Sequence, residues 1–212
     1  MRLYTRWQNS AGERVRIALH LKGLTYEYVA VGALLPGEYR ALNPQGLMPA
    51  LCVGDRIIAQ STAILEYLEE TRPEPTLLPA GPIDRAEARA FAQLITSDLH
   101  PINNNRVRNY LSERLGAGED DVLAWYRHWV GLALASLEAT LAGRRRDRPF
   151  CFGDGPGWAD LHLTPQLANA RRFGCGLSAY PRLLAVDARC SDLDAFRRAR
   201  PEAQPDYPGV GD

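Results

Sequence analysis

Two short stretches of the chain carry groups that could hold a small peptide. Met48-Pro49 stands directly before a strand-like run, and Gln60-Ser61 introduces a helix pattern one hairpin further along. If the Met48–Pro49 bond is cis, the N–H and C=O of Met48 turn outward, where an extended peptide could pair with them. Ser61 stands at the expected N-cap, and the free N–H groups behind it suit a carboxylate. The residues therefore predict a backbone clamp beside an anion pocket.

The pattern around these stretches supplies the elements that must position them. It predicts a turn, the two strands of a hairpin and a helix, in the ranges 43–46, 50–53, 57–59 and 61–70. Each feature also has a purely structural reading, in which Pro49 starts a strand and Ser61 only caps a helix. Their occurrence together in this order favours the binding site.

Composition excludes several classes of function. The 212 residues have a formal net charge of zero, so no global field attracts nucleic acid or an anionic membrane. No apolar stretch approaches the roughly 20 residues that span a bilayer. The four cysteines have no metal-ligand spacing, so we predict no metal site and expect reduced thiols in a cytoplasmic protein. The run Arg144-Arg145-Arg146 is expected to be a solvated loop.

The hydrophobic patterns divide the chain into two domains. Over residues 1–78 the order strand, helix, strand, then hairpin and helix, predicts an α/β domain resembling the thioredoxin fold. Prolines mark a linker at 79–84, and residues 85–212 form an all-α domain. The expected helices cover 84–115, with an interruption near His100-Pro101, then 120–142, and two more after residues 157 and 180. The tail from residue 201 is expected to be frayed.

Several of these residues form motifs of a known family. NPQGLMPAL followed by QSTAILEYLEE resembles the glutathione-binding half of the cytosolic glutathione transferases. RVRIAL with LKG, within residues 14–23, and DLHPINN, at 98–104, resemble the zeta class, which contains maleylacetoacetate and maleylpyruvate isomerases. The resemblance covers nearly the whole chain. It implies glutathione as cofactor and a thioredoxin-like domain followed by a helical bundle.

The resemblance also assigns roles to the first domain. Met48 and Pro49 would clamp the cysteinyl backbone of glutathione, while Gln60 and Ser61 would bind its γ-glutamyl end. The thiol has an ordinary pKa near 8.5, so the enzyme must stabilise the thiolate, for instance by a donor at a helix N-terminus. The family has two adjacent serines at this place, and this chain has Asn9 and Ser10. Asn9, Ser10 or backbone N–H groups could each provide the donor, and Ser10 could equally be a plain helix cap.

Substrate binding requires positive groups, because the implied substrate carries two carboxylates and develops an enolate. By family position the candidates are His100, Arg106 and Arg172. An arginine that often precedes the serine motif is Gln8 here, and Asn105 stands where a second arginine can occur. The structural alternatives are a histidine at a helix break and arginines at the protein surface.

The leading hypothesis is a glutathione-dependent cis–trans isomerase of a maleyl keto acid, with maleylpyruvate favoured slightly over maleylacetoacetate because of Arg106. The alternatives are a general glutathione transferase or dehalogenase acting on small electrophiles, or a glutathione-binding protein with weak catalysis. The family also implies a homodimer. Asp160 is expected at N3 of a helix capped by Gly157, which is a structural role.

Overall fold

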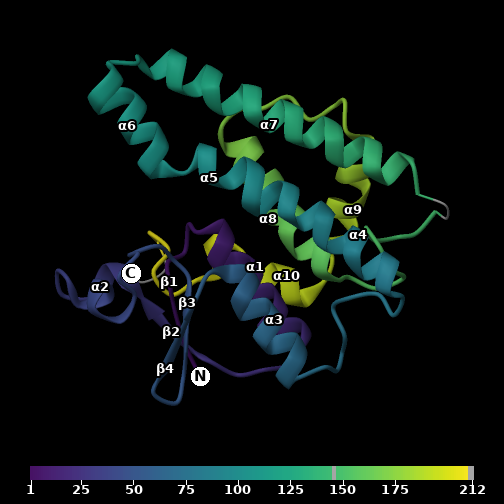
Figure 1. Cartoon of the computed structure of the whole chain (residues 1–212), viewed down its shortest axis with the longest axis horizontal. Coiled ribbons are helices and arrows are strands. Elements are labelled where there is room, and N and C mark those ends of the chain that lie inside the picture. The colour runs from purple at the N-terminus through teal and green to yellow at the C-terminus, as the bar shows by residue number, and fades with distance from the viewer. Residues whose placement is uncertain (145–146, 210–212) are drawn as a thin grey trace. The chain divides into compact units, whose positions relative to one another are not determined.

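A four-stranded mixed sheet forms the centre of the N-terminal part of the chain (Figure 1). The computed structural model describes residues 1–144 and 147–209. The strands of the sheet lie in the order β2-β1-β3-β4. β1 runs parallel to β2 and antiparallel to β3, and β3 runs antiparallel to β4. The strands are β1 (Arg2–Thr5), β2 (Glu27–Ala30), β3 (Ala50–Val53) and β4 (Arg56–Ala59). This βαβ unit followed by a ββα unit confirms the predicted thioredoxin-like fold.

Two helices pack beside the sheet in the same unit. α1 (Ser10–Leu21) and α3 (Ser61–Thr71) contact each other, and α3 also contacts β3 and β4. Gly23 follows α1 with φ of +64°, a backbone angle that favours glycine, and it provides the predicted helix stop. A 3₁₀ turn (Val31–Ala33) and the short helix α2 (Glu38–Leu42) connect β2 to the hairpin.

The C-terminal segment belongs to the same compact unit as the sheet. The chain divides into Met1–Leu77 with Ser191–Asp212, and Leu78–Cys190. Arg16, fully buried on α1, donates from Nε and Nη2 to the carbonyl of Ala199 at 3.0 and 2.8 Å. Ala199 ends α10 (Asp194–Ala199), which a 3₁₀ turn (Pro201–Ala203) follows. The helical region was expected to continue to residue 212, whereas this segment groups with the sheet.

The tail beyond the 3₁₀ turn is held by specific contacts. Asp206 accepts hydrogen bonds from the Trp7 backbone N–H at 3.1 Å and from the Tyr28 hydroxyl at 2.6 Å, and the Trp7 and Tyr207 rings meet edge to face. The expectation of a frayed tail was therefore wrong over the described residues. The tail supports the loop that leads from β1 into α1.

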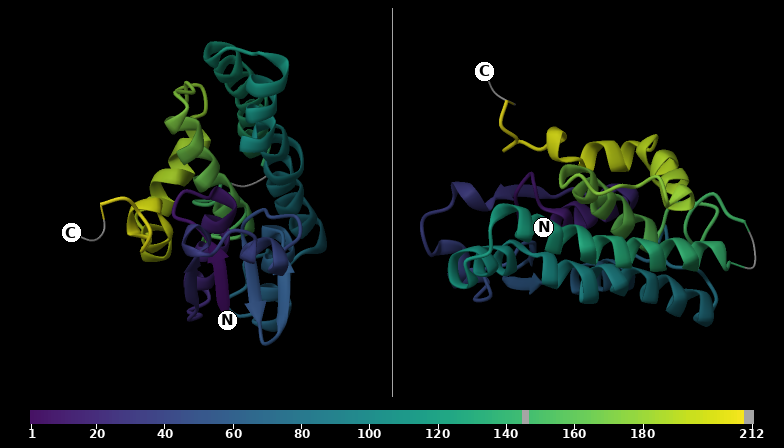
Figure 2. Two further views of the ribbon diagram at one scale, coloured as in Figure 1. Left: turned by 90° about the vertical axis from the view of Figure 1, so that its left-hand side faces the viewer. Right: turned by 90° about the horizontal axis from the view of Figure 1, so that it is seen from above.

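The second unit is built of helices, which Figure 2 shows from two further directions. They are α4 (Pro82–Gln93), a π-helical segment (Leu94–Leu99), α5 (His100–Asn103), α6 (Asn105–Leu115), α7 (Glu119–Ala142), α8 (Trp158–Arg172) and α9 (Pro181–Ser191). The first four form a nearly continuous rod. Its break lies at Asn104, with ψ of 152°, close to the interruption predicted near His100-Pro101. Pro101 is tolerated there because it occupies the first turn of α5.

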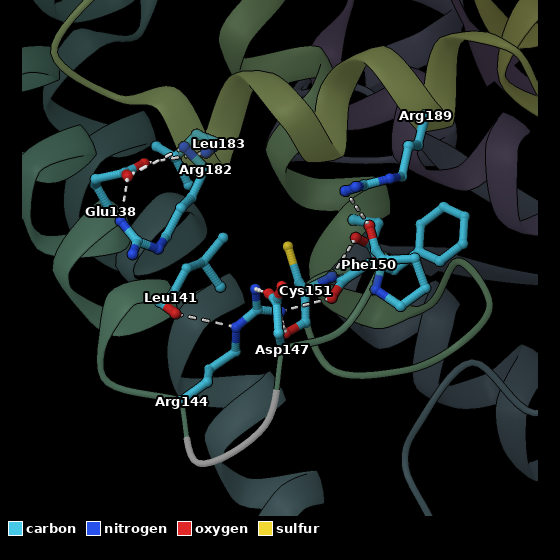
Figure 3. A network of polar contacts seen from close by, with 11 residues as sticks. Glu138, Leu141, Arg144, Asp147, Phe150, Cys151, Arg182, Leu183 and Arg189 are labelled. Carbon is cyan, nitrogen blue, oxygen red and sulfur yellow. Dashed lines mark hydrogen bonds and ion pairs between the residues drawn. The ribbon is translucent and has the colours of Figure 1, made fainter.

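The connection between α7 and α8 is fixed by Arg144 (Figure 3). Its Nη1 donates to the carbonyls of Phe150 and Cys151, each at 2.7 Å, and its Nε donates to the carbonyl of Leu141. The solvated loop predicted for this arginine run is thus wrong for Arg144, while Arg145 and Arg146 lie outside the described residues. None of the helices described here is long and apolar enough to cross a membrane.

Candidate active site

The strand register brings the predicted residues of the first unit to one edge of the sheet. Ala50 pairs with Tyr4 on one side and with Ala59 on the other. The segments that leave β1, enter β3 and leave β4 therefore start from the same end of the strands. These segments carry Asn9 and Ser10, Met48 and Pro49, and Gln60 and Ser61, respectively.

Met48 offers an open backbone edge at this place. Neither its N–H nor its C=O takes part in a hydrogen bond with another described residue, because the β3 ladder begins at Ala50. The Met48–Pro49 bond is cis. The Met48 side chain packs on the cluster of Tyr4, Tyr39 and Ala50, so this backbone edge rests on a buried support. It can pair with an extended peptide as a sheet edge does.

The start of α3 lacks a side-chain cap. Gln60, rather than Ser61 as predicted, is the N-cap residue, and no side chain accepts a hydrogen bond from the first turn. The N–H groups of Ser61, Thr62 and Ala63 find no acceptor among the described residues. Gln60 has φ of +71°, the one non-glycine residue with positive φ in the part of the chain described. Such an angle costs energy and often marks a functional position.

A buried arginine lies behind this helix start. Arg14 is 1% exposed, and its Nη1 donates to Ser61 Oγ at 3.2 Å. Its Nε and Nη2 are buried and have no hydrogen-bond partner within the described chain. Burial lowers the Arg14 pKa to about 10, so the side chain stays charged at neutral pH. Three orphan backbone donors, a hydroxyl and a buried cation thus converge at one helix start, which suits a carboxylate.

The start of α1 is arranged differently. Asn9, rather than Ser10, is the N-cap residue, and its Oδ1 accepts a hydrogen bond from the Gly12 backbone N–H. Gly12 permits this close approach, since a Cβ there would lie 2.0 Å from Thr5 Oγ1 and 2.8 Å from Asn9 Oδ1. Ser10 occupies the first helical position and is 8% exposed.

The hydrogen bond that caps α1 determines which atom of the Asn9 side-chain amide remains available. Because Oδ1 accepts from the Gly12 N–H, the NH₂ group is the part of the amide that is left to donate elsewhere. No described residue accepts a hydrogen bond from this NH₂ group or from the Ser10 hydroxyl. Both residues therefore keep a donor that a thiolate could use.

The remaining predicted residues lie in the second unit. His100 is half-buried at the first position of α5, Arg106 is exposed on α6, and Arg172 is exposed at the last position of α8. The Arg172 guanidinium lies 4.7 Å from the centre of the Phe173 ring. Arg106 uses its backbone N–H to bond Asn104, and its side chain makes no hydrogen bond or ion pair with the described residues.

The residues of the first unit fit glutathione. Met48 provides a backbone edge for a peptide, the start of α3 provides a carboxylate site, and the start of α1 provides donors for a sulfur anion. A tripeptide with a carboxylate at one end and a central thiol matches this set of groups.

Comparison with known proteins agrees with this arrangement. Residues 8–76 match the family model of the glutathione S-transferase N-terminal domain. The maleylpyruvate isomerase of Ralstonia sp is 47% identical over 210 residues, which cover 97% of this chain and 99% of that protein. The chain belongs to the glutathione S-transferase family.

Two solved structures define the class. The holo structure of a maleylpyruvate isomerase, described as a bacterial zeta-class transferase, has a TM-score of 0.93 and 46% identity, with 98% of this chain and 100% of that chain covered. A maleylacetoacetate isomerase from Methylobacterium extorquens AM1, solved with bound malonate and GSH, has a TM-score of 0.92 and 40% identity, with 99% and 100% coverage. This transferase is therefore of the zeta class.

Arg14 and Gly12 are the residues of the site that the sequence did not reveal. Arg14 was noted as part of a family motif, but its burial against Ser61 depends on the packing of α1 on α3. The available signal is a charged residue within the apolar pattern of α1, because arginine is almost never fully buried unless it is paired.

Proposed function

We propose that this transferase catalyses the glutathione-dependent cis–trans isomerisation of a maleyl keto acid, maleylpyruvate or maleylacetoacetate, to the fumaryl isomer. The observation that supports the proposal is the strand register, because it brings the segments that carry Asn9, Met48 and Ser61 to one end of the sheet. Similarity to isomerases along the whole chain supports the choice of reaction.

We assign glutathione binding to the first unit. Met48 and Pro49 hold the cysteinyl backbone, and Gln60 and Ser61 hold the γ-glutamyl carboxylate with help from Arg14. Bound glutathione supplies a thiolate that adds reversibly to the double bond of the substrate and leaves after rotation. The Asn9 amide or the Ser10 hydroxyl donates to the sulfur and favours the thiolate over the thiol.

We assign substrate binding to the second unit. His100, Arg106 and Arg172 supply positive charge or donors for the carboxylates and for the oxygen that becomes negative during the reaction. An arginine pairs with a planar carboxylate through two parallel hydrogen bonds, which also orient the substrate. Malonate, bound in the related structure from Methylobacterium extorquens, is a dicarboxylate of this kind.

The test is conversion of maleylpyruvate followed by proton NMR, which distinguishes the cis from the trans vinyl protons. We expect turnover with reduced glutathione and none without it. S-methylglutathione is the matched control, because it retains every backbone and carboxylate contact but has no free thiol. It should inhibit turnover competitively without supporting it. Turnover that is independent of glutathione would refute the proposal.

Two residues that differ from the family motif favour a second activity, that of a general glutathione transferase. Gln8 and Asn9 stand where the family motif has an arginine and a serine, so one carboxylate contact and one hydroxyl donor are replaced. A site with fewer carboxylate contacts would suit small neutral electrophiles, which is the chemistry of a general transferase. Parallel measurement of kcat/KM for maleylpyruvate and for a chloro-aromatic substrate decides between the two, and the larger value identifies the activity.

We also propose that the chain acts as a homodimer in the cytoplasm. Membership of the transferase family supports the dimer, and the use of reduced glutathione, which the cytosol maintains, supports the location. Light scattering coupled to size-exclusion chromatography measures the mass directly. A mass near that of one 23.5 kDa chain at micromolar concentration would refute the dimer.

A further inference from the structure

Three arginines of the second unit converge on Phe173, the residue that follows α8. The Arg108 and Arg172 guanidinium carbons lie 4.6 and 4.7 Å from the centre of its ring. Arg127 donates from Nε to the Phe173 carbonyl at 2.9 Å. We refer to Phe173, Arg108, Arg127 and Arg172 as the Phe173 cluster. The sequence patterns indicated Arg172 and did not indicate Arg108.

Two arginines of the Phe173 cluster, Arg108 and Arg127, have no carboxylate partner among the described residues. The neighbouring Arg171 does form one, with Asp187 Oδ2 at 2.6 Å, so that carboxylate is already engaged. Like charges gathered on one ring repel each other, and an anion placed among them would relieve this repulsion.

Arg108 is held in a fixed orientation. Its guanidinium stacks on Phe173 and also lies 5.7 Å from the centre of the Tyr126 ring. Its Nη2 donates to Asn105 Oδ1, one turn earlier on α6. Its Nε is buried and lacks a hydrogen-bond partner among the described residues. A stacked guanidinium presents its N–H groups in one plane at its edge, which is the arrangement that a carboxylate requires.

A second unsatisfied buried group belongs to Asn103, which also contacts Tyr126. Asn103 donates from Nδ2 to the Tyr126 carbonyl at 3.2 Å, while its Oδ1 is buried and bonds none of the residues described. An unused acceptor and an unused donor therefore flank Tyr126. Buried polar groups are normally satisfied, so such a pair indicates a site that water or a polar ligand fills.

We propose that Arg108, held by Phe173 and Asn105, is a carboxylate-binding residue of this chain and that it acts with Arg172 on one carboxylate of the dicarboxylate substrate. The identity of that substrate rests on the proposed isomerase function. Arg108 thereby becomes a determinant of specificity for substrates that carry an acidic group at this position. Stacking for structural reasons alone is the competing explanation, and it predicts no effect on ligand choice.

The test compares two ligands by calorimetry. S-(1,2-dicarboxyethyl)glutathione carries the two carboxylates, and S-ethylglutathione lacks them. We expect Arg108→Met to weaken binding of the dicarboxyethyl ligand by about tenfold or more, because a hydrogen bond to a charged group is lost. Binding of S-ethylglutathione should stay within about twofold. Arg108→Lys should restore only part of the loss, because an ammonium lacks the planar fork.

Arg114→Met is the matched control, since Arg114 is an exposed arginine of the same helix. It should leave the ratio of the two affinities unchanged. Equal weakening of both ligands by Arg108→Met, or no weakening, would overturn the proposal. A lowered melting temperature with an unchanged affinity ratio would do the same.

Failure of the proposed function would look different. If the wild-type chain binds neither glutathione derivative, the proposed dependence on glutathione is wrong, but the role of Arg108 is not yet tested. Titration with malonate alone then decides the point. Reduced malonate affinity in Arg108→Met supports the carboxylate site, and unchanged affinity refutes it.

Discussion

The buried guanidinium of Arg14 donates a hydrogen bond to Ser61 Oγ at 3.2 Å, while two of its other nitrogens lack any partner in the described chain. This bond occupies an acceptor site of the hydroxyl and leaves its O–H to donate outward. A carboxylate at the start of α3 would therefore meet a polarised hydroxyl with a cation directly behind it. The arrangement is costly without a ligand, because a buried charge without a carboxylate partner is poorly solvated.

We predict that Arg14→Met separates binding from stability. Affinity for glutathione should fall by about tenfold or more, because the charge that attracts the γ-glutamyl carboxylate is removed. The free energy of unfolding without ligand should stay the same or rise, because methionine fills similar volume without a desolvated charge. Calorimetry measures the first quantity and urea denaturation the second.

Arg16→Met is the contrasting variant. Arg16 is equally buried, but its donors bond the carbonyls of Ala199, Arg6 and Trp7. Its replacement leaves these carbonyls without their donor and should lower the free energy of unfolding by about 2–4 kcal/mol. Equal destabilisation by both variants would show that Arg14 has a structural role like that of Arg16.

The second prediction concerns the donor to the sulfur. Asn9→Ala should raise the pKa of the bound glutathione thiol by about one unit, since one hydrogen bond to a charged group such as the thiolate is worth about 1.5 kcal/mol. Ser10→Ala should raise it less, because Asn9 occupies the cap position where the helix begins. Thiolate absorbance of the complex, measured against pH, gives both values.

Asn9→Ser serves as the matched variant, because serine can cap the helix and also donate its hydroxyl. It should keep the fold stable and lower the thiol pKa relative to Asn9→Ala. If Ser10→Ala has the larger effect on the thiol pKa, the assignment to Asn9 is wrong and Ser10 is the donor.

The third prediction concerns Glu13, which is 7% exposed in the first turn of α1. Burial raises the pKa of this carboxyl from 4.5 to about 7, despite attraction to Arg16, Arg200 and Arg14, while Glu202 adds repulsion. Below pH 4.5 both the folded and the unfolded chain hold the proton. Between pH 4.5 and 7 only the unfolded chain releases the proton, so the free energy of unfolding falls as the pH rises. Above pH 7 the free energy of unfolding stays lower by about 3 kcal/mol.

Glu13→Gln removes this titration. We expect the stability of the variant relative to the wild type to increase by about 3 kcal/mol between pH 4.5 and pH 8, measured by urea denaturation at both values. His20, whose pKa burial lowers to about 4, titrates in both proteins and cancels in the comparison. A difference that does not change with pH would contradict the raised pKa.

Much of the fold could be predicted because local patterns determine it. Glycines mark where elements end. Gly54 stands in the turn between two strands and Gly23 follows a helix, and both have a positive φ that glycine favours. The N-cap predicted at Ser61, and the one considered as an alternative role for Ser10, each lie one position after the cap in the structure, because serine is the usual cap and Gln60 is an uncommon one. A strained backbone angle at Gln60 leaves no trace in the local sequence.

The rest depends on contacts between segments that are distant in the chain. Arg14 meets Ser61 across two helices, and Asp206 meets Trp7 and Tyr28 across most of the chain length. Similarly, family position indicates Arg106, whereas the stacking of Arg108 on Phe173 depends on tertiary packing. Sequence patterns identify elements and motifs, whereas the partners of buried charges require the folded structure.

The last prediction concerns Asp160, which lies at N3 of α8 as expected and is 1% exposed. Its Oδ2 accepts from the Gly157 N–H at 2.9 Å, and its Oδ1 accepts from the Cys151 N–H at 2.8 Å. Asp160→Ala removes both acceptors, so the free energy of unfolding should fall by about 2–4 kcal/mol. Glutathione affinity of the folded fraction should not change, because the described residues that the carboxylate bonds lie in the α7–α8 connection and at the start of α8. Asp154 lies in an exposed part of the same connection, so Asp154→Ala should leave both quantities unchanged. Reduced glutathione affinity in folded Asp160→Ala would instead assign the Asp160 carboxylate a role in binding.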